Sequence, residues 1–187
     1  HNHTRLECAD WNDGLDMAKV NGESVAFSCM YAYNLELLSK LLQKIGREKI
    51  KIAQELNLLL SPVNYNNVKA KQALLEKYFS LTKSVVSGKK ISRDAFWLAE
   101  DLKHKSEWMR KHIRKTEWLS EGFFNGYYDN QAKRVEGLKQ NTLRMILASQ
   151  VFPIISGLAD EKQINRILKN AQRYLWDKKL KSFHLNT

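Results

Sequence analysis

The sequence predicts an all-α fold, and three observations lead to that prediction. Only 2 Pro and 8 Gly occur among the 187 residues, so few positions interrupt helices or form the frequent turns of a β-sandwich. Leu, Lys, Ala and Glu, which favour helices, are abundant. Apolar residues recur at three- and four-residue spacing along most of the chain. We therefore expect a helical protein with at most a short β-hairpin.

The first predicted helix follows a polar segment. Residues 1–21 show no helical period, and we interpret them as an irregular loop. From Gly22 to Ile45 the apolar residues keep helical spacing, which predicts one long amphipathic helix. Gly46 ends this helix, because glycine accepts the left-handed backbone conformation found at helix C-termini.

Three more helices are predicted in the middle of the chain, over about 48–60, 68–86 and 93–119. The first ends before Pro62, since a residue that precedes proline avoids the helical backbone region. Gly88 ends the second helix. Ser92 is a suitable N-cap for the third.

The C-terminal third predicts one extended segment and two helices. Aromatic residues and glycines alternate over 122–129, which indicates a short strand or hairpin. The segment 141–156 is apolar nearly all round, so we expect a buried helix that Pro153 kinks. The last helix, over 160–176, has one apolar face and an aspartate N-cap, Asp160.

Charge and composition exclude some classes of protein. The net charge of +11 and pI near 9.6 permit binding to nucleic acid, but Lys and Arg are spread along the chain. We therefore interpret them as solvated helix faces and expect no nucleic-acid partner. No apolar run approaches the ~18 residues of a membrane span, so we expect no membrane partner. The two cysteines lack a CxxC spacing, which predicts free thiols and a cytoplasmic location.

The loop 7–16 carries the residues best suited to chemistry. Three carboxylates, an Asn and a Trp fall within the seven residues of Asp10-Trp11-Asn12-Asp13-Gly14-Leu15-Asp16. An indole packs on the apolar face of a pyranose, and Asp and Asn bind sugar hydroxyls. A carboxyl group against an indole is partly desolvated, which raises its pKa and suits it to act as a general acid.

Two other interpretations of this loop stay open. Its Asp and Asn side chains can cap a turn by accepting backbone N–H groups. A calcium loop is the other interpretation, but a loop counted from Asp10 has Asn21 at its twelfth position, where an EF-hand needs Glu.

The motif Asp10–Asp16, followed by Gly22-Glu-Ser-Val25, resembles the catalytic loop of family 94 glycoside phosphorylases, the cellobiose and chitobiose phosphorylase group. A second stretch is similar to the segment of that family in which an aromatic turn precedes a buried helix. It comprises Gly122-Phe-Phe-Asn-Gly-Tyr-Tyr-Asp-Asn130 and then Gln150-Val-Phe-Pro-Ile-Ile-Ser-Gly157.

The resemblance implies an activity and a set of site residues. The family performs inverting phosphorolysis of a β-linked disaccharide or oligosaccharide to an α-sugar 1-phosphate. Asp13 falls on the general acid and Trp11 on the aromatic that lines the donor sugar subsite. Asp10 and Asn12 would position the loop or bind sugar hydroxyls. Inorganic phosphate is the co-substrate, and neither a metal nor an organic cofactor is implied.

The resemblance also implies an architecture. Residues 1–187 would form part of an (α/α)6-barrel catalytic domain, with the catalytic loop at 1–21, barrel helices at 22–187 and an insertion around 61–121. The family's phosphate-binding residues would lie outside this chain. We therefore expect an interior fragment that is inactive alone and associates with the rest of its barrel or with copies of itself.

Two alternatives come from other mechanisms. An inverting glycoside hydrolase would need a second essential carboxylate about 6.5–9.5 Å from Asp13 to activate water. A basic helical nucleic-acid-binding module would show an affinity that falls steeply with salt.

Overall fold

The computed structural model describes residues 1–6, 13–46, 48–60 and 62–187, and the chain divides into two compact units. The terminal unit comprises His1 and residues 3–34 and 106–187. The central unit comprises Asn2 and residues 35–105, and so overlaps the insertion expected around 61–121. The boundary between the units falls within two long helices, α1 (Val25–Lys44) and α3 (Ala95–Thr116).

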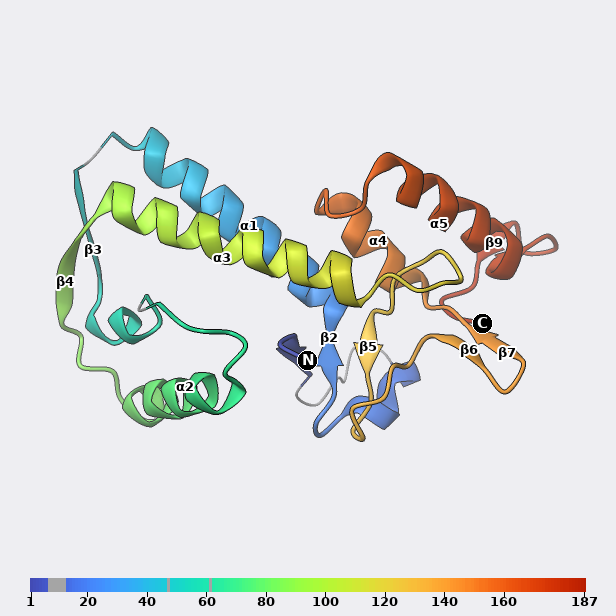
Figure 1. The fold of residues 1–187 in the computed structure, drawn as a ribbon, viewed down its shortest axis with the longest axis horizontal. Helices are drawn as coiled ribbons and strands as arrows, with labels where there is room; N and C mark the ends of the chain where they lie inside the picture. Colours follow the sequence, from blue (N-terminus) through green and yellow to red (C-terminus); the bar gives the residue numbers. More distant parts are fainter. Residues whose placement is uncertain (7–12, 47, 61) are drawn as a thin grey trace. The chain divides into compact units, whose positions relative to one another are not determined.

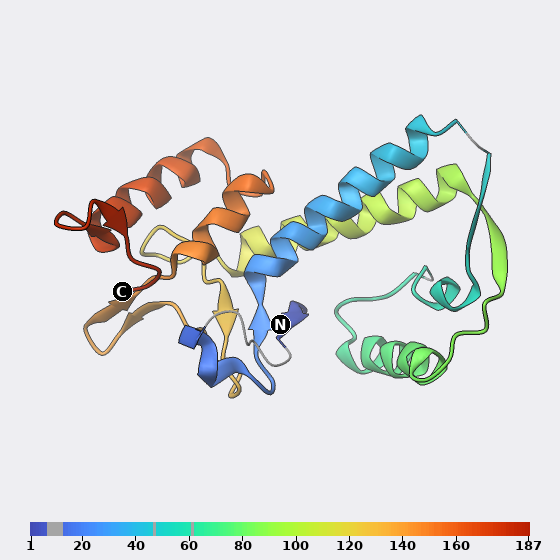
Figure 2. The ribbon, with the colours of Figure 1, turned by 180° about the vertical axis from the view of Figure 1, so that it is seen from behind.

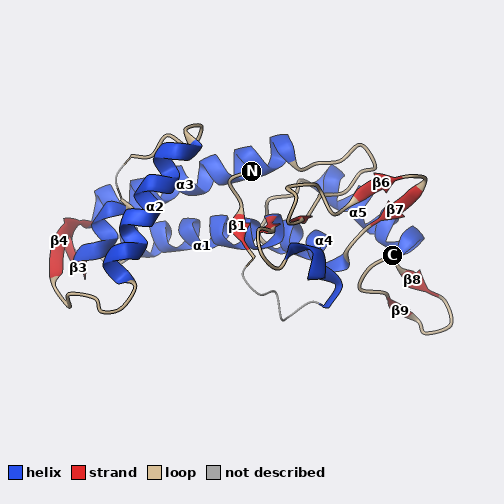
Figure 3. Ribbon diagram, turned by 90° about the horizontal axis from the view of Figure 1, so that it is seen from below, coloured by secondary structure: helices blue, strands red, loops and turns tan. Residues whose placement is uncertain are grey.

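The predicted all-α fold, as part of an (α/α)6 barrel, is wrong. The described residues form five α-helices together with four small β-sheets, a mixed architecture (Figure 3). The strands are only two to five residues long, and many pair with segments far away in the sequence. Such short strands have too few residues to establish an alternating pattern, and so local periodicity did not reveal them.

The terminal unit combines a three-stranded sheet with two hairpins and helices (Figure 1). The sheet has the antiparallel order β1-β2-β5, and β6–β7 and β8–β9 form separate hairpins. Besides parts of α1 and α3, its elements are β1 (Thr4–Arg5), the 3-10 helix η1 (Asp13–Ala18), β2 (Glu23–Ser24), β5 (Tyr127–Tyr128), β6 (Gly137–Lys139), β7 (Thr142–Arg144), α4 (Leu147–Ile155), α5 (Glu161–Tyr174), β8 (Trp176–Asp177) and β9 (Ser182–Phe183).

Two clusters of buried side chains form the core of the terminal unit. The larger joins the start of α1 and the end of α3 to the C-terminal helices, through Val25, Cys29, Ile113, Phe123, Phe124, Met145, Leu158, Ile167 and Leu175. The smaller surrounds the three-stranded sheet and contains Leu6, Leu15, Ala18, Tyr127, Val135 and Ile146. Each cluster combines residues from the N-terminal and the C-terminal parts of the chain. The core of this unit therefore needs both parts of the chain to form.

Two of the predicted helices are confirmed with their ends. Helix α1 follows the predicted range, and Gly46 has the left-handed φ of +66° expected after a helix C-terminus. Asp160 caps α5 in a reciprocal capping box with Gln163. Helix α4 departs from its prediction: it begins at Leu147 rather than near 141, because β6 and β7 occupy the preceding residues.

The predicted burial of the whole α4 surface is also wrong. Ser149, Gln150 and Pro153 are buried, whereas Val151 and Ile155 are exposed. The buried face of this helix therefore carries two polar side chains. One of these side chains, Gln150, hydrogen-bonds the backbone of the aromatic stretch 122–130, as described below.

The central unit contains a two-stranded ribbon, a 3-10 helix and helix α2 (Figure 2). Its elements, besides parts of α1 and α3, are β3 (Lys49–Ala53), η2 (Gln54–Leu58), α2 (Val68–Thr82) and β4 (Lys90–Asp94). The predicted helix over 48–60 is wrong, because β3 pairs antiparallel with β4, from Lys49 opposite Asp94 to Ala53 opposite Lys90. The exposed and half-buried positions of β3 alternate, as in a ribbon covered on one face.

The ribbon also changes how two helices end or begin. Ser92 lies within β4 and is not the N-cap of α3; instead Asp94 accepts a hydrogen bond from the backbone N–H of Trp97 at 2.7 Å. Helix α2 ends at Thr82, before the predicted end at 86, and Gly88 lies in the following loop with a φ of +69°. None of the helices in the described part of the chain is long and apolar enough to cross a membrane.

Candidate functional site

The structure does not place the side chains predicted to carry the chemistry. Asp10, Trp11 and Asn12 lie outside the described residues. Asp13 is the first residue of η1, and its side chain is likewise outside the description. What the structure defines is the framework on both sides of this loop.

The residues directly before the loop are hydrogen-bonded to the residues that follow it. Strand β1 pairs with β2, with Thr4 opposite Ser24 and Arg5 opposite Glu23. Next to this pair, the backbone N–H of Leu6 donates to the carbonyl of Gly22 at 2.8 Å. A Cβ at Gly22 would lie 2.3 Å from the carbonyl oxygen of Ala18, so only glycine fits this close approach.

The two stretches that carry the family resemblance lie beside each other. Strand β2 pairs with β5, with Glu23 opposite Tyr128 and Ser24 opposite Tyr127 (Figure 1). The side-chain oxygen of Asn130 accepts hydrogen bonds from the backbone N–H groups of Val20 and Asn21, both at 2.9 Å. The sequence therefore brings a segment more than 100 residues away against the end of the motif.

Beneath β5 lies a buried carboxylate, Glu117, with no exposed surface. Both of its oxygens accept from the hydroxyl of Tyr128, at 3.0 and 2.9 Å. The amide of Asn125 donates to the same carboxylate at 3.1 Å. Nε2 of His3 also lies within hydrogen-bond distance of it, at 3.2 Å. Burial alone would raise the pKa of Glu117, but the hydrogen bonds from His3 and Asn125 lower it to about 2. Glu117, which directly follows α3, is therefore an anion that joins His3, directly before β1, to Tyr128 in β5.

A second buried carboxylate, Glu136, lies near Gly126 and is only 2% exposed. It accepts from the backbone N–H groups of Gly126 at 2.6 Å and Ile146 at 2.8 Å, and from the amide of Gln150 at 3.1 Å. Burial raises its pKa to about 7, against the opposing effect of these donors. The two carboxylates are thus set apart by their surroundings, since one stays charged and the other titrates near neutrality.

The aromatic stretch 122–130 is held rigidly by these partners. Gln150 is buried, and its amide accepts from the N–H of Phe124 at 2.9 Å and donates to the carbonyl of Phe124 at 2.8 Å. A Cβ at Gly126 would lie 2.1 Å from the Ser149 hydroxyl, so the backbone needs glycine here. Asp129 accepts from the backbone N–H groups of Gln131 and Lys133 and so holds the turn that follows β5.

Sequence reasoning missed Glu117, Glu136 and His3 as parts of this framework. Each was an isolated polar residue without a motif, and its partners are distant in the sequence. The available signal was local: Glu117 lies in the last turn of the helix predicted over 93–119, and Glu136 lies a few residues after the aromatic stretch. Burial of these carboxylates became visible only with the tertiary contacts.

The framework suits the positioning of a loop more than chemistry of its own. Glu117 and Glu136 are almost entirely enclosed, and their oxygens are occupied by protein donors. Within the described ranges, no group of three or more His, Cys, Asp or Glu side chains could hold a metal ion. Reacting groups would therefore come from the loop that this framework carries.

Comparison with known proteins gives no independent assignment. No family model matches the chain, and none of the curated proteins matches it at a significant level.

Proposed function

We propose that the chain belongs to a carbohydrate-active enzyme that performs inverting phosphorolysis of a β-linked glucoside, with Asp13 as the general acid. The proposal rests on the resemblance of Asp10–Asp16 to the catalytic loop of the family 94 glycoside phosphorylases. Trp11 would provide the face on which the sugar packs, and Asp10 and Asn12 would position the loop or bind hydroxyl groups.

One structural observation supports this proposal above the others. The two separate stretches that resemble the family pair directly through β2 and β5, with Asn130 bridging the backbone that follows the motif. The buried anion Glu117 and the hydrogen-bonded Gln150 then fix the stretch that supports the loop.

The proposed reaction needs one protein acid. An oxygen of hydrogen phosphate attacks the anomeric carbon while the glycosidic C–O bond breaks, with inversion at that carbon. Asp13 donates its proton to the leaving oxygen and becomes a carboxylate. The proton of the phosphate restores the acid, so the products are an α-sugar 1-phosphate and a free hydroxyl group. A second carboxylate is unnecessary because phosphate is already a nucleophile, unlike the water of an inverting hydrolase.

The substitution Asp13→Asn tests the assigned acid in the full-length protein. We expect the rate to fall about 10²–10⁴-fold with little loss of sugar binding, because the amide keeps the shape and cannot donate the proton. The matched control is Asp16→Asn, in the same 3-10 helix, whose exposed carboxylate pairs with Lys19. A near-normal rate in Asp13→Asn would exclude this residue as the acid.

The activity itself is measured with β-linked disaccharides of glucose and of N-acetylglucosamine, with and without phosphate. Release of a sugar 1-phosphate only when phosphate is present supports the phosphorylase. Free reducing sugar without phosphate would instead identify an inverting hydrolase. We also propose a cytoplasmic location, in keeping with the buried free thiol of Cys29.

A further inference from the structure

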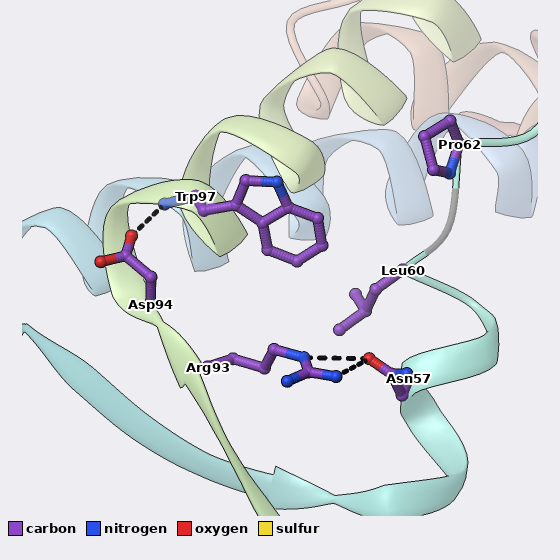
Figure 4. A pocket seen from close by; sticks show the side chains of 6 residues that line it. All are labelled: Asn57, Leu60, Pro62, Arg93, Asp94 and Trp97. Atoms are coloured by element: carbon purple, nitrogen blue, oxygen red, sulfur yellow. Dashed lines mark hydrogen bonds between the residues drawn. The ribbon is translucent and has the colours of Figure 1, made fainter.

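The central unit contains a cavity of about 410 Å³, which no pattern in the sequence predicts. Its size falls within the roughly 300–1,000 Å³ of small-molecule sites. All of its lining residues belong to the central unit. They are Asn57, Leu60, Pro62, Arg93, Asp94 and Trp97 (Figure 4).

One wall of this cavity is the indole of Trp97. Trp97 is 45% exposed on the first turn of α3. Among the described residues its ring stacks on no other ring. Figure 4 shows the indole on one side of the cavity and the Arg93–Asn57 pair on the other. An exposed indole beside a cavity offers a flat apolar surface to a ligand.

The opposite wall is a polar pair held in place by hydrogen bonds. The guanidinium of Arg93 donates to Oδ1 of Asn57 through Nε at 2.9 Å and Nη2 at 2.5 Å. Because both bonds use the Asn57 oxygen, the amide nitrogen of Asn57 remains a donor without a partner in the described structure. Arg93 itself is placed by the register of the ribbon, opposite Ile50.

Asp94 adds an acceptor at the edge of the cavity. One of its carboxylate oxygens accepts from the N–H of Trp97, and this bond fixes both the side chain and the start of α3. The other oxygen has no partner in the described structure. The cavity thus presents an apolar aromatic face, an amide donor, a guanidinium and a carboxylate acceptor, with Leu60 and Pro62 completing the apolar lining.

We propose that this cavity binds one unit of a neutral saccharide, with the pyranose ring against Trp97 and its hydroxyl groups toward Asn57, Arg93 and Asp94. A pyranose has an apolar face of C–H groups, which an indole covers, and a rim of hydroxyls that both donate and accept. The cavity matches both features. A free phosphate would face the Asp94 carboxylate and gain nothing from the indole, so the lining favours a neutral ligand.

This inference goes beyond the proposed catalytic function. It concerns a second place on the chain where a saccharide binds, and it stands whether or not Asp13 is a general acid. A binding place outside the reacting loop would retain an oligosaccharide by a sugar unit that does not react.

The test measures binding of cellobiose, cellotetraose and N,N′-diacetylchitobiose to the full chain by titration calorimetry and saturation-transfer NMR. Trp97→Ala should weaken binding of the preferred saccharide about tenfold or more, because it removes the aromatic wall. Trp97→Phe keeps an aromatic face and should bind within about threefold of the unaltered protein. Phe96→Ala is the matched control, since Phe96 is the adjacent residue on α3, is 67% exposed and does not line the cavity.

Other outcomes would overturn the proposal. Absence of binding for every saccharide would do so, as would equal binding by Trp97→Ala and Phe96→Ala. Preferential binding of adenosine monophosphate that depends on Trp97 would show a nucleobase pocket instead. Binding that is lost in Trp11→Ala and kept in Trp97→Ala would place the sugar at the catalytic loop, which refutes this cavity while leaving the proposed function intact.

Discussion

The terminal and central units differ in how their helices and strands are held. In the terminal unit Phe123 and Phe124 have no exposed surface, and long-range hydrogen bonds to Glu117 and Glu136 join its segments. In the central unit no residue of α2 is buried, and Phe79 on that helix is 59% exposed. The comparison teaches that the two roles proposed for this chain fall to different units. The terminal unit, with its buried core, holds the loop that carries the motif, and the exposed central unit holds the cavity proposed to bind a ligand.

The charge follows the same division. Residues 35–105 contain fourteen of the 31 Lys and Arg but only seven of the 20 Asp and Glu, so most of the net charge of +11 lies there. The exposed face of the ribbon carries Lys49, Lys51 and Lys90. The two units therefore differ in charge as well as in burial.

The largest expected effect comes from truncating one phenylalanine in each unit. Phe124→Ala should lower the free energy of unfolding of the terminal unit by about 3–5 kcal/mol, because it leaves a cavity in the core. Phe79→Ala in α2 should change stability by no more than about 0.5 kcal/mol. Urea unfolding combined with amide hydrogen exchange in each unit measures both. Equal losses would show that α2 is covered in solution and would remove the contrast.

An intermediate effect is expected from the two buried carboxylates of the terminal unit. The pKa of Glu117 is lowered from 4.5 to about 2, so its stabilisation is complete above pH 4.5 and is lost as the pH falls towards 2. The pKa of Glu136 is raised from 4.5 to about 7, so its contribution is complete below pH 4.5 and is lost as the pH rises through 7. Each change should be on the order of 3 kcal/mol.

Unfolding free energies measured from pH 2 to 8 separate these two contributions. Glu117→Gln should flatten the acid limb only, and Glu136→Gln the limb between pH 5 and 8 only. Amide exchange in the central unit serves as the internal control, since neither carboxylate belongs to it. A Glu136→Gln variant that retains the full decline between pH 5 and 8 would contradict the role of burial at this residue.

The smallest effect concerns the helix caps, one in each unit. Asp160 caps α5 and accepts from the N–H of Gln163 at 2.8 Å, and Asn67 caps α2 and accepts from the N–H of Ala70 at 3.0 Å. Replacement of either by Ala should cost about 1 kcal/mol. In α5 the buried Ile167 and Ala171 should confine the loss to a lower midpoint of unfolding.

In α2 the same loss should appear as faster amide exchange through most of the helix, since no buried side chain retains it. Hydrogen exchange of the two variants provides the measurement. If the Asn67→Ala variant shows faster exchange in its first turn alone, α2 is stabilised by contacts beyond its own unit.

The predictability of the elements depended on where their stabilising partners lie. Helix α5 was predicted with its cap because Asp160, Gln163 and the apolar face are within one segment. Strand β3 was taken as a helix, because its partner β4 begins 37 residues after β3 ends. The alternation of Lys and Ile from Lys49 to Ile52 was the available signal, and the apolar run that follows it obscured the pattern.

The candidate site was predictable only in part. The motif Asp10–Asp16 could be recognised in the sequence, because its chemistry depends on residue types at fixed short spacing. The positions of Glu117, Gln150 and Trp97 could not be recognised in that way, since each depends on which surfaces the folded chain leaves buried or open. Trp97 in particular lies on the regular helix α3, and only the tertiary contacts show that it lines a cavity.

The sequence by itself determined the local features: the C-terminal end of α1, the N-cap of α5 at Asp160 and the motif that supports the proposed reaction. Only the tertiary structure decided that β2 meets β5, that Glu117 is charged while Glu136 titrates near pH 7, and that Trp97 faces a cavity. The physical reason is range. Caps, turns and helical spacing involve neighbours in the chain, whereas strand pairing, burial and cavities depend on residues that only the completed fold brings together.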